Sequence, residues 1–192
     1  RTPVTSTPKE INNVLRRENL LCNSKYTNMD DFFVTIIDAI SLCQEDIHRH
    51  GSERLFWFQN EKKEWLPRSE PDISRGIASF LNSYGAMKNF DITCEPLAGS
   101  GEMDFYVTAP VNNGIGKIVI EAKKANSEDI VRGFTDQLPY YMQKVGTDYG
   151  IYLVYWLKSE FYPYPPLQEN YQQLEIEKFH SISRLSTIRT LG

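Results

Sequence analysis

Cysteine is scarce in this 192-residue chain, and no apolar run is long enough to cross a membrane. Cys22, Cys43 and Cys94 are odd in number and form no Cys-x-x-Cys pair, which argues against a disulfide framework and a structural zinc site. The longest apolar run, residues 151–157, is far shorter than a membrane span, and the first residues show no signal-peptide pattern. We therefore expect a cytoplasmic protein with no membrane partner.

The chain also lacks an excess of positive charge, because its formal net charge is -4. Proteins that coat nucleic acid non-specifically depend on many Lys or Arg contacts to phosphate, so this balance argues against that class. It leaves a divalent metal site open, because carboxylates that hold a metal lower the net charge while a local basic patch can still bind an anionic substrate. The composition, 41% hydrophobic and 24% charged, is typical of a folded globular protein.

Hydrophobic periodicity predicts three helices, over residues 30–51, 70–84 and 127–146. Their expected N-caps are Asp30, Ser69 and Ser127, and their expected stops are Gly51, Gly85 and Gly146. Pro139 should kink the third helix. A short helix in an N-terminal arm up to about residue 28 and a last helix over 169–179 complete the helical prediction.

Short apolar runs predict the strands. Residues 55–66 are expected to form a hairpin, and residues 181–192 an edge strand. An antiparallel meander is expected from 90–94, 102–108 and 117–123, followed by a strand buried on both faces at 149–157. The predicted fold class is α/β (α+β), with a central mixed β-sheet flanked by helices. Residues 1–68 would form an extension packed on a core of residues 69–192.

Acidic residues interrupt two of the predicted strands. Asp104 lies within an apolar segment, and after a gap of 16 residues Glu121 and Lys123 end the segment that begins at Ile118. Because strand side chains alternate, Glu121 and Lys123 project from the same face. Two half-buried carboxylates disfavour joint ionisation unless a cation compensates them. We expect Mg²⁺, or Mn²⁺ in its place, because Mg²⁺ takes one or two protein carboxylates and keeps water and phosphate as its other ligands.

These residues resemble the PD-(D/E)XK nuclease superfamily, whose restriction-endonuclease-like core carries an acid on one strand and (D/E)-x-K on the next. The resemblance spans about residues 69–156. It implies that Asp104 is the first acid and that Glu121, Ala122 and Lys123 form the second motif. It also implies that Glu70 is the acid of the preceding helix, and it matches Gln137 and Tyr141, at i and i+4, to an accessory Gln-x-x-x-Tyr motif.

The family pattern has one departure in this chain. Met103, not proline, precedes Asp104, whereas Pro71-Asp72 spells the dipeptide that names the family. We interpret Pro71-Asp72 as the opening of a helix, because it is far from Glu121 in sequence and Asp104 is on the adjoining strand.

The site assignments implied by this resemblance are hypotheses. Asp104, Glu121 and Glu70 would bind the metal with the help of the Ala122 carbonyl, and Lys123 would orient water or stabilise the transition state. Plainer interpretations remain. Glu-x-Lys alone is typical of a solvated strand end, and Glu70 could simply favour the helix dipole. The accessory residues could be an ordinary pair on an amphipathic helix.

The predicted function is metal-dependent hydrolysis of DNA phosphodiesters, with nucleic acid as the partner. The start at Arg1 suggests further domains of a longer chain, and a microbial defence or restriction-like protein is our hypothesis for it. Two alternatives stay open. One is an RNA-directed or junction-directed nuclease on the same fold. The other is a non-catalytic module that binds nucleic acid or protein. The oligomeric state, including a homo-oligomer, is also open.

Overall fold

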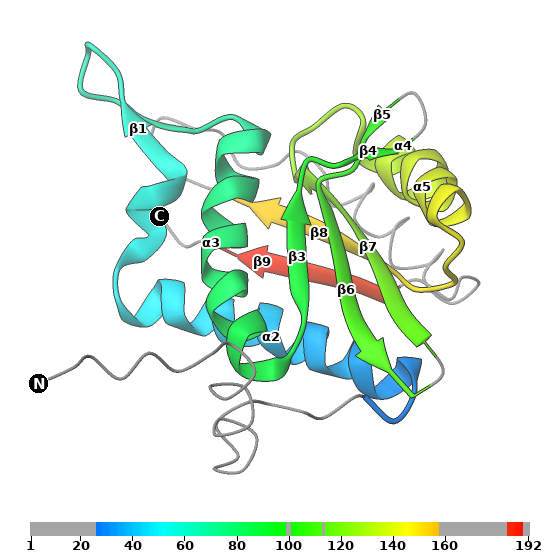
Figure 1. The fold of residues 1–192 in the computed structure, drawn as a ribbon. Helices are drawn as coiled ribbons and strands as arrows, with labels where there is room; N and C mark the ends of the chain where they lie inside the picture. The colour runs from blue at the N-terminus through cyan, green and yellow to red at the C-terminus, as the bar shows by residue number, and fades with distance from the viewer. Residues whose placement is uncertain (1–25, 99–100, 113, 158–183, 190–192) are drawn as a thin grey trace, which may run out of the picture.

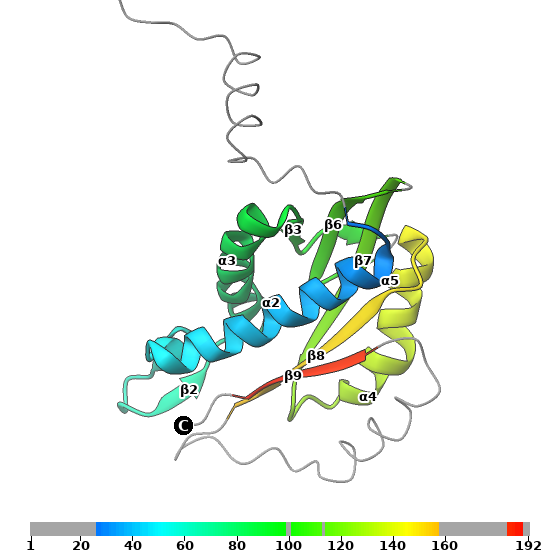
Figure 2. The same ribbon diagram turned by 90° about the horizontal axis from the view of Figure 1, so that it is seen from below.

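The computed structural model describes residues 26–98, 101–112, 114–157 and 184–189. Its centre is a five-stranded sheet with the order β3-β6-β7-β8-β9, and helices cover both faces (Figures 1 and 2). The pairs within β3-β6-β7 are antiparallel, and the pairs within β7-β8-β9 are parallel. The predicted α+β class with a mixed sheet flanked by helices is therefore confirmed.

Helix α2 (Met29–Arg49) is the first helix of the described chain and matches the predicted helix closely. The predicted cap was wrong. Asn28, not Asp30, is the N-cap, and its side chain accepts a hydrogen bond of 2.9 Å from the Asp31 amide. Asp30 lies in the first turn, where its negative charge favours the helix dipole. Gly51 follows the helix end with a φ of 64°, as expected of a stop.

A small hairpin connects α2 to the next helix. After a 3₁₀ turn η1 (Ser52–Phe56), β1 (Trp57–Gln59) pairs antiparallel with β2 (Trp65–Pro67), which confirms the predicted hairpin. Figure 1 shows that this hairpin projects away from the five-stranded sheet.

Helix α3 (Glu70–Lys88) begins where the sequence predicts and ends later. The Ser69 side chain accepts a hydrogen bond from the Asp72 amide, which confirms Ser69 as the cap. The predicted stop at Gly85 was wrong, because the helix continues to Lys88 and ends at Asn89, whose φ is 60°. Gly85 serves close packing instead, since a Cβ there would lie 2.5 Å from the carbonyl oxygen of Phe90.

The predicted meander is confirmed, with strands β3 (Asp91–Cys94), β6 (Phe105–Val111) and β7 (Gly114–Lys124). The second strand begins at Phe105 and not at Glu102. Glu102 belongs to a separate two-stranded hairpin, β4 (Leu97–Ala98) and β5 (Gly101–Glu102). Asp104 consequently lies in the bend directly before β6 and not inside the strand.

The third predicted helix is divided into three pieces: α4 (Ile130–Arg132), a π-helical turn η2 (Gly133–Gln137) and α5 (Leu138–Val145). The predicted cap at Ser127 was wrong, because the helix begins after Asp129. The interruption expected near Pro139 is the π-helical turn directly before it. Proline cannot donate the i to i-4 hydrogen bond to Thr135, so a regular helix cannot continue through this point. Gly146 ends α5 with a φ of 69°, as predicted.

Strand β8 (Gly150–Trp156) is buried on both faces and runs parallel to β7, as the strand-helix-strand order predicts. The edge strand predicted in the tail is β9 (Arg184–Arg189), parallel to β8. The predicted helix at 169–179, Cys22 and the arm up to residue 25 lie outside the described residues. None of the described helices is long and apolar enough to cross a membrane.

Two apolar clusters hold the helices on the sheet. The larger one packs α2 and α3 against one face and includes Phe32, Ile77 and Ile120. The second packs α4, η2 and α5 against the other face and includes Phe134 and Tyr152. Because both clusters reach β7, this strand is enclosed on both sides over residues 118–122. Charged side chains at its end are therefore placed at the rim of a buried region.

Candidate active site

Asp104 is held against the end of β7 by its own side chain. Phe105 pairs with Ile120 in the antiparallel register, so Asp104 stands opposite Glu121. The Asp104 Oδ2 atom accepts a hydrogen bond of 2.7 Å from the backbone amide of Ala122. The carboxylate thus takes the place of a backbone carbonyl at the last step of the sheet, and its position depends on β7 directly.

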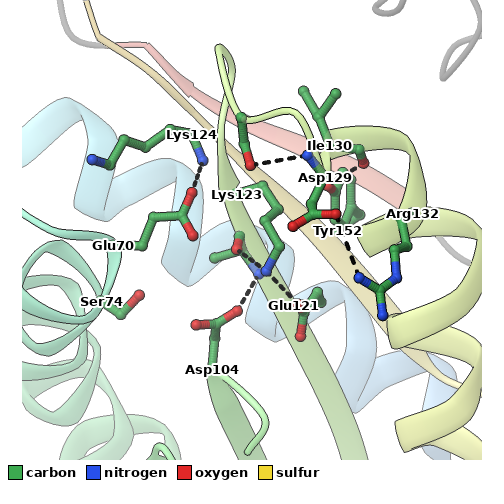
Figure 3. A network of polar contacts seen from close by, with 12 residues as sticks. Glu70, Ser74, Asp104, Glu121, Lys123, Lys124, Asp129, Ile130, Arg132 and Tyr152 are labelled. Atoms are coloured by element: carbon green, nitrogen blue, oxygen red, sulfur yellow. Dashed lines mark hydrogen bonds and ion pairs between the residues drawn. The ribbon is translucent and has the colours of Figure 1, made fainter.

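Glu121 and Lys123 meet on one face of β7, as the strand alternation predicts. The Lys123 Nζ atom lies 2.6 Å from Glu121 Oε1, and it also donates to the Ala122 carbonyl oxygen at 3.2 Å. Side-chain exposure is 2% for Glu121 and 12% for Lys123. Figure 3 shows Asp104, Glu121 and Lys123 pointing toward one another. The ammonium therefore touches two of the oxygen atoms that the sequence predicts as metal ligands.

Two buried side-chain oxygen atoms of the described residues have no hydrogen-bond partner: Glu121 Oε2 and Gln137 Oε1. A buried acceptor without a donor costs about 1–3 kcal/mol, and more when it is charged. Both atoms belong to residues that the sequence singled out as site residues. They are acceptors ready for a donor or a cation.

The electrostatics of the two acids reflect an excess of negative charge. Burial raises the pKa of Asp104 to about 6, although the Ala122 amide and the Lys123 ammonium act to lower it. Burial and the neighbouring Asp104 carboxylate raise the pKa of Glu121 to about 7. Burial alone would lower the pKa of Lys123, but its pairing with Glu121 holds that pKa above its usual value. One lysine therefore does not compensate both carboxylates.

Glu70 approaches this centre from α3 without joining it through a hydrogen bond. Its Oε1 atom accepts a hydrogen bond of 2.7 Å from the backbone amide of Lys124 (Figure 3). Its charge raises the pKa values of Asp104, Glu121 and Lys123, so it lies within electrostatic reach of all three. The structure brings Glu70 to the rim of the site, one residue beyond the lysine of the second motif.

The two accessory residues differ in how closely they approach. Tyr141 is buried, and its pKa is raised by burial and then by the Glu121 charge, so it lies within electrostatic reach of that acid. Its hydroxyl also requires a glycine at position 101, since a Cβ there would lie 2.6 Å from that oxygen. Within the described residues, no hydrogen bond joins Gln137 to Asp104, Glu121 or Lys123.

Sequence reasoning missed the residues that fix Lys123 from the α4 side. A Cβ at Gly133 would lie 3.1 Å from Lys123 Cγ and 2.6 Å from the Tyr152 hydroxyl oxygen. That hydroxyl donates to the Ile130 carbonyl oxygen and so ties β8 to the start of α4 (Figure 3). Glycine lets η2 pack directly on the stem of the lysine. Its position inside an amphipathic helical pattern was the signal that could have revealed it.

Sequence reasoning also missed a buried hydroxyl pair on the opposite face of the sheet. Ser74 Oγ lies 2.9 Å from the Tyr155 hydroxyl oxygen, and both side chains are almost fully buried. Ser74 is one helical turn after Glu70. The pKa of Tyr155 is raised by burial and then by the Asp104 charge, so the pair lies within reach of the acids. A serine on the apolar face of α3 was the signal in the sequence that could have predicted this pair.

The donor set fits a hard divalent cation. Among the described residues, no three His, Cys, Asp or Glu side chains converge as a ready metal site. Mg²⁺ does not require three, since it commonly takes one or two carboxylates and completes its octahedron with water and phosphate. The unpartnered Glu121 Oε2, the Asp104 carboxylate and the Ala122 carbonyl supply oxygen donors of this kind.

Comparison with known proteins gives one match. A family model described as a domain of unknown function (DUF8371) matches residues 32–159. No curated protein and no solved structure matches the chain. The matched region covers more than half of the sequence and contains every residue of the candidate site. The chain therefore belongs to the DUF8371 family.

Proposed function

We propose that this chain is a metal-dependent nuclease that hydrolyses DNA phosphodiester bonds. One observation carries the proposal. Glu121 is 2% exposed, lies beside Asp104 and keeps one carboxylate oxygen without a partner. A protein that needed this acid only for stability would be expected to pair both oxygens or replace the residue by an apolar one. The resemblance to PD-(D/E)XK nucleases suggests the same function from the motif alone.

Asp104, Glu121 and the Ala122 carbonyl are the residues that would hold Mg²⁺, with Glu70 at its outer side. Bound Mg²⁺ supplies Lewis acidity toward water and toward the phosphate oxygens. The excess negative charge at Asp104 and Glu121 supports this assignment, because a cation is what would lower their raised pKa values.

The remaining residues position these groups. The Ala122 amide holds the Asp104 carboxylate at the end of β7. Lys123 brings a positive charge to the same point and stabilises the negative charge that develops on a phosphate during hydrolysis. Gly133 and Tyr152 let η2 pack against the stem of Lys123. Tyr141 of α5 is buried within electrostatic reach of Glu121 and would help to exclude water from the carboxylates.

The proposed substrate is DNA, and the three separate cysteines favour a reducing compartment such as the cytoplasm. RNA and branched DNA remain alternative substrates, since a metal held by carboxylates and a lysine would act on the phosphodiester group that all of these nucleic acids share. If the chain is part of a longer defence or restriction-like protein, other domains of that protein would select the nucleic acid that is cleaved.

The direct test incubates the 192-residue protein with plasmid DNA, branched DNA and RNA in Mg²⁺ or Mn²⁺. We expect cleavage of DNA, and we expect Glu121→Gln to reduce it by at least about 100-fold, because the variant removes one metal-binding charge without changing shape. Glu61→Gln is the matched control, since Glu61 is exposed on the tip of the β1–β2 hairpin. It should cleave like the natural sequence.

Calorimetric titration with Mn²⁺ separates the remaining possibilities. Binding that Glu121→Gln abolishes supports the metal site independently of cleavage. Mn²⁺ binding and nucleic-acid binding without cleavage would make the chain a non-catalytic module. Preferential cleavage of RNA would change the substrate and keep the mechanism. Absence of both Mn²⁺ binding and cleavage would overturn the proposal.

A further inference from the structure

A hollow lined mainly by polar residues lies next to the candidate site, beyond the end of β7. It has a volume of about 380 Å³ and is lined by Ser69, Glu70, Pro71, Lys124, Asn126 and Ser127. We call it the Lys124 pocket. It shares Glu70 with the candidate site, and its lysine directly follows Lys123. The two places are thus adjacent along one strand end.

Lys124 leaves β7 on the other face from Lys123. Strand alternation requires this, and Figure 3 shows its side chain on the side of Glu70, away from Asp104 and Glu121. Consecutive Cα atoms lie only about 3.8 Å apart, so the two lysines start from neighbouring points. A polymer strand that passes across the end of β7 would present one group to the Lys123 side and a following group to the Lys124 side.

The Lys124 ammonium differs from the other cations at this end of the molecule. Lys123 pairs with Glu121, and Arg132 lies near Asp129. Lys124 has no carboxylate within 4.0 Å in the described part of the chain, although it is half-buried. An unneutralised ammonium in a hollow is suited to an anion from solution.

The other donors of the pocket are available as well. The Ser127 Oγ atom accepts from the Asp129 amide, so its own proton is free to be donated elsewhere. The half-buried Asn126 offers an amide group beside it. Ser69 contributes less, because its hydroxyl donates to the Asp72 carboxylate. Lys124, Asn126 and Ser127, which all line the pocket, thus each carry a hydrogen-bond donor.

We propose that the Lys124 pocket binds the phosphate next to the scissile phosphate of a polynucleotide. This inference rests on the proposed function, and it specifies the substrate as a polymer with at least two consecutive phosphates. Glu70 lies between the candidate site and the Lys124 pocket. Its carboxylate is fixed to the Lys124 amide and repels a phosphate pressed against it, so the bound phosphate lies on the Asn126–Ser127 side.

The test measures binding and not cleavage. A fluorescent single-stranded DNA of 12 nucleotides is titrated with protein in EDTA over a series of salt concentrations. Replacing one phosphate-binding lysine should raise Kd about tenfold and reduce the slope of log K against log salt by about 0.7. We expect both changes for Lys124→Gln, and we expect Lys124→Arg to restore most of the affinity because it keeps the charge.

Lys62→Gln is the matched control. Lys62 is exposed on the tip of the β1–β2 hairpin, outside the pocket and the candidate site, so its loss should leave Kd and the salt slope as they are. A purely structural role of Lys124 would lower the melting temperature without reducing the salt slope. That result, or an unchanged Kd in Lys124→Gln, would overturn the inference.

The outcomes of the two proposals can be distinguished. DNA binding that depends on Lys124 in a protein that never cleaves with any metal supports the pocket and overturns the nuclease proposal. Metal-dependent cleavage with an affinity that ignores Lys124 overturns the pocket alone. Because the binding titration contains no metal, its result does not depend on the metal site.

Discussion

At its C-terminal end, β7 has different side chains and different covering helices on its two faces. Toward α4 and α5, Glu121 and Lys123 form a buried ion pair beneath a helix that is broken by a π-helical turn. Toward α3, Ala122 lies in the apolar core, and Lys124 opens into a polar hollow beside a regular, capped helix. The comparison shows that charge is concentrated where the covering helix is irregular.

A physical reason connects the two features. A regular helix covers a sheet with whole turns of apolar side chains, whereas the π-helical turn η2 and its Gly133 let the backbone approach Lys123 directly. The close approach of η2 fixes the aliphatic stem of Lys123, while its ammonium group pairs with Glu121 beside Asp104. On the α3 face, buried polar groups are instead paired with each other, as in the Ser74–Tyr155 hydrogen bond.

The sharpest test of this comparison replaces each lysine in turn. Lys123→Met should reduce the rate constant of cleavage at saturating substrate by at least about 100-fold, because charge stabilisation at the phosphate is lost. Lys124→Met should act mainly on KM. Steady-state kinetics on oligonucleotide DNA would measure both. Equal losses of kcat in the two variants would remove the distinction between the faces.

The pH dependence of stability tests the charged face without substrate. In the folded protein the pKa values of Asp104 and Glu121 are raised to about 6 and about 7, so protonation favours the folded state. Their stabilising contribution is complete below about pH 4 and is lost as the pH rises through 6 and 7. We expect the free energy of unfolding of the metal-free protein to be lower at pH 8 than at pH 5 by on the order of a few kcal/mol. Its melting temperature should be lower at pH 8 accordingly.

Two comparisons check that explanation of the pH effect. Glu121→Gln should flatten the pH profile, whereas Glu61→Gln should not change it, because Glu61 is exposed on the tip of the β1–β2 hairpin. Mg²⁺ should raise the melting temperature more at pH 8 than at pH 5. A profile that rises toward pH 8 in metal-free protein would contradict the raised pKa values.

Gly133 tests whether the close approach of η2 matters. In Gly133→Ala the new Cβ would clash with the Tyr152 hydroxyl oxygen at 2.6 Å and crowd Lys123 Cγ at 3.1 Å. We expect a loss of about 1–3 kcal/mol in unfolding free energy and a further loss of cleavage beyond that explained by unfolding. Gly76→Ala is the control, since its Cβ would meet only Phe56 at 3.7 Å. Denaturant titration would measure both.

The smallest effect is expected on the α3 face. Tyr155→Phe or Ser74→Ala removes one half of a buried hydroxyl pair and should cost about 1–2 kcal/mol, with the double variant costing less than the sum of the two. A double-mutant cycle by thermal unfolding measures the coupling. Mn²⁺ affinity should remain within about twofold. A large change in that affinity would show that the hydroxyl pair takes part in the site.

Much of the fold could be predicted because its signals are local. The helical stripes of α2 and α3, the Ser69 cap and the apolar run of β8 each follow from residues close in sequence. Errors fell where packing outweighs a local preference. Gly85 was predicted to end a helix and instead allows close packing on Phe90. Pro139 does mark where the third helix is interrupted, but the π-helical form of that interruption was not predicted.

The sequence by itself determined the acids and the lysine of the candidate site and the face of β7 on which Glu121 and Lys123 lie, because alternation along a strand is a property of the backbone. Only the tertiary structure decided that the bend before β6 carries Asp104 to the Ala122 amide, that Glu70 binds the Lys124 amide, and that one oxygen of Glu121 stays unpaired. These contacts join segments distant along the chain. Their geometry depends on how helices pack across the sheet, which no local pattern encodes.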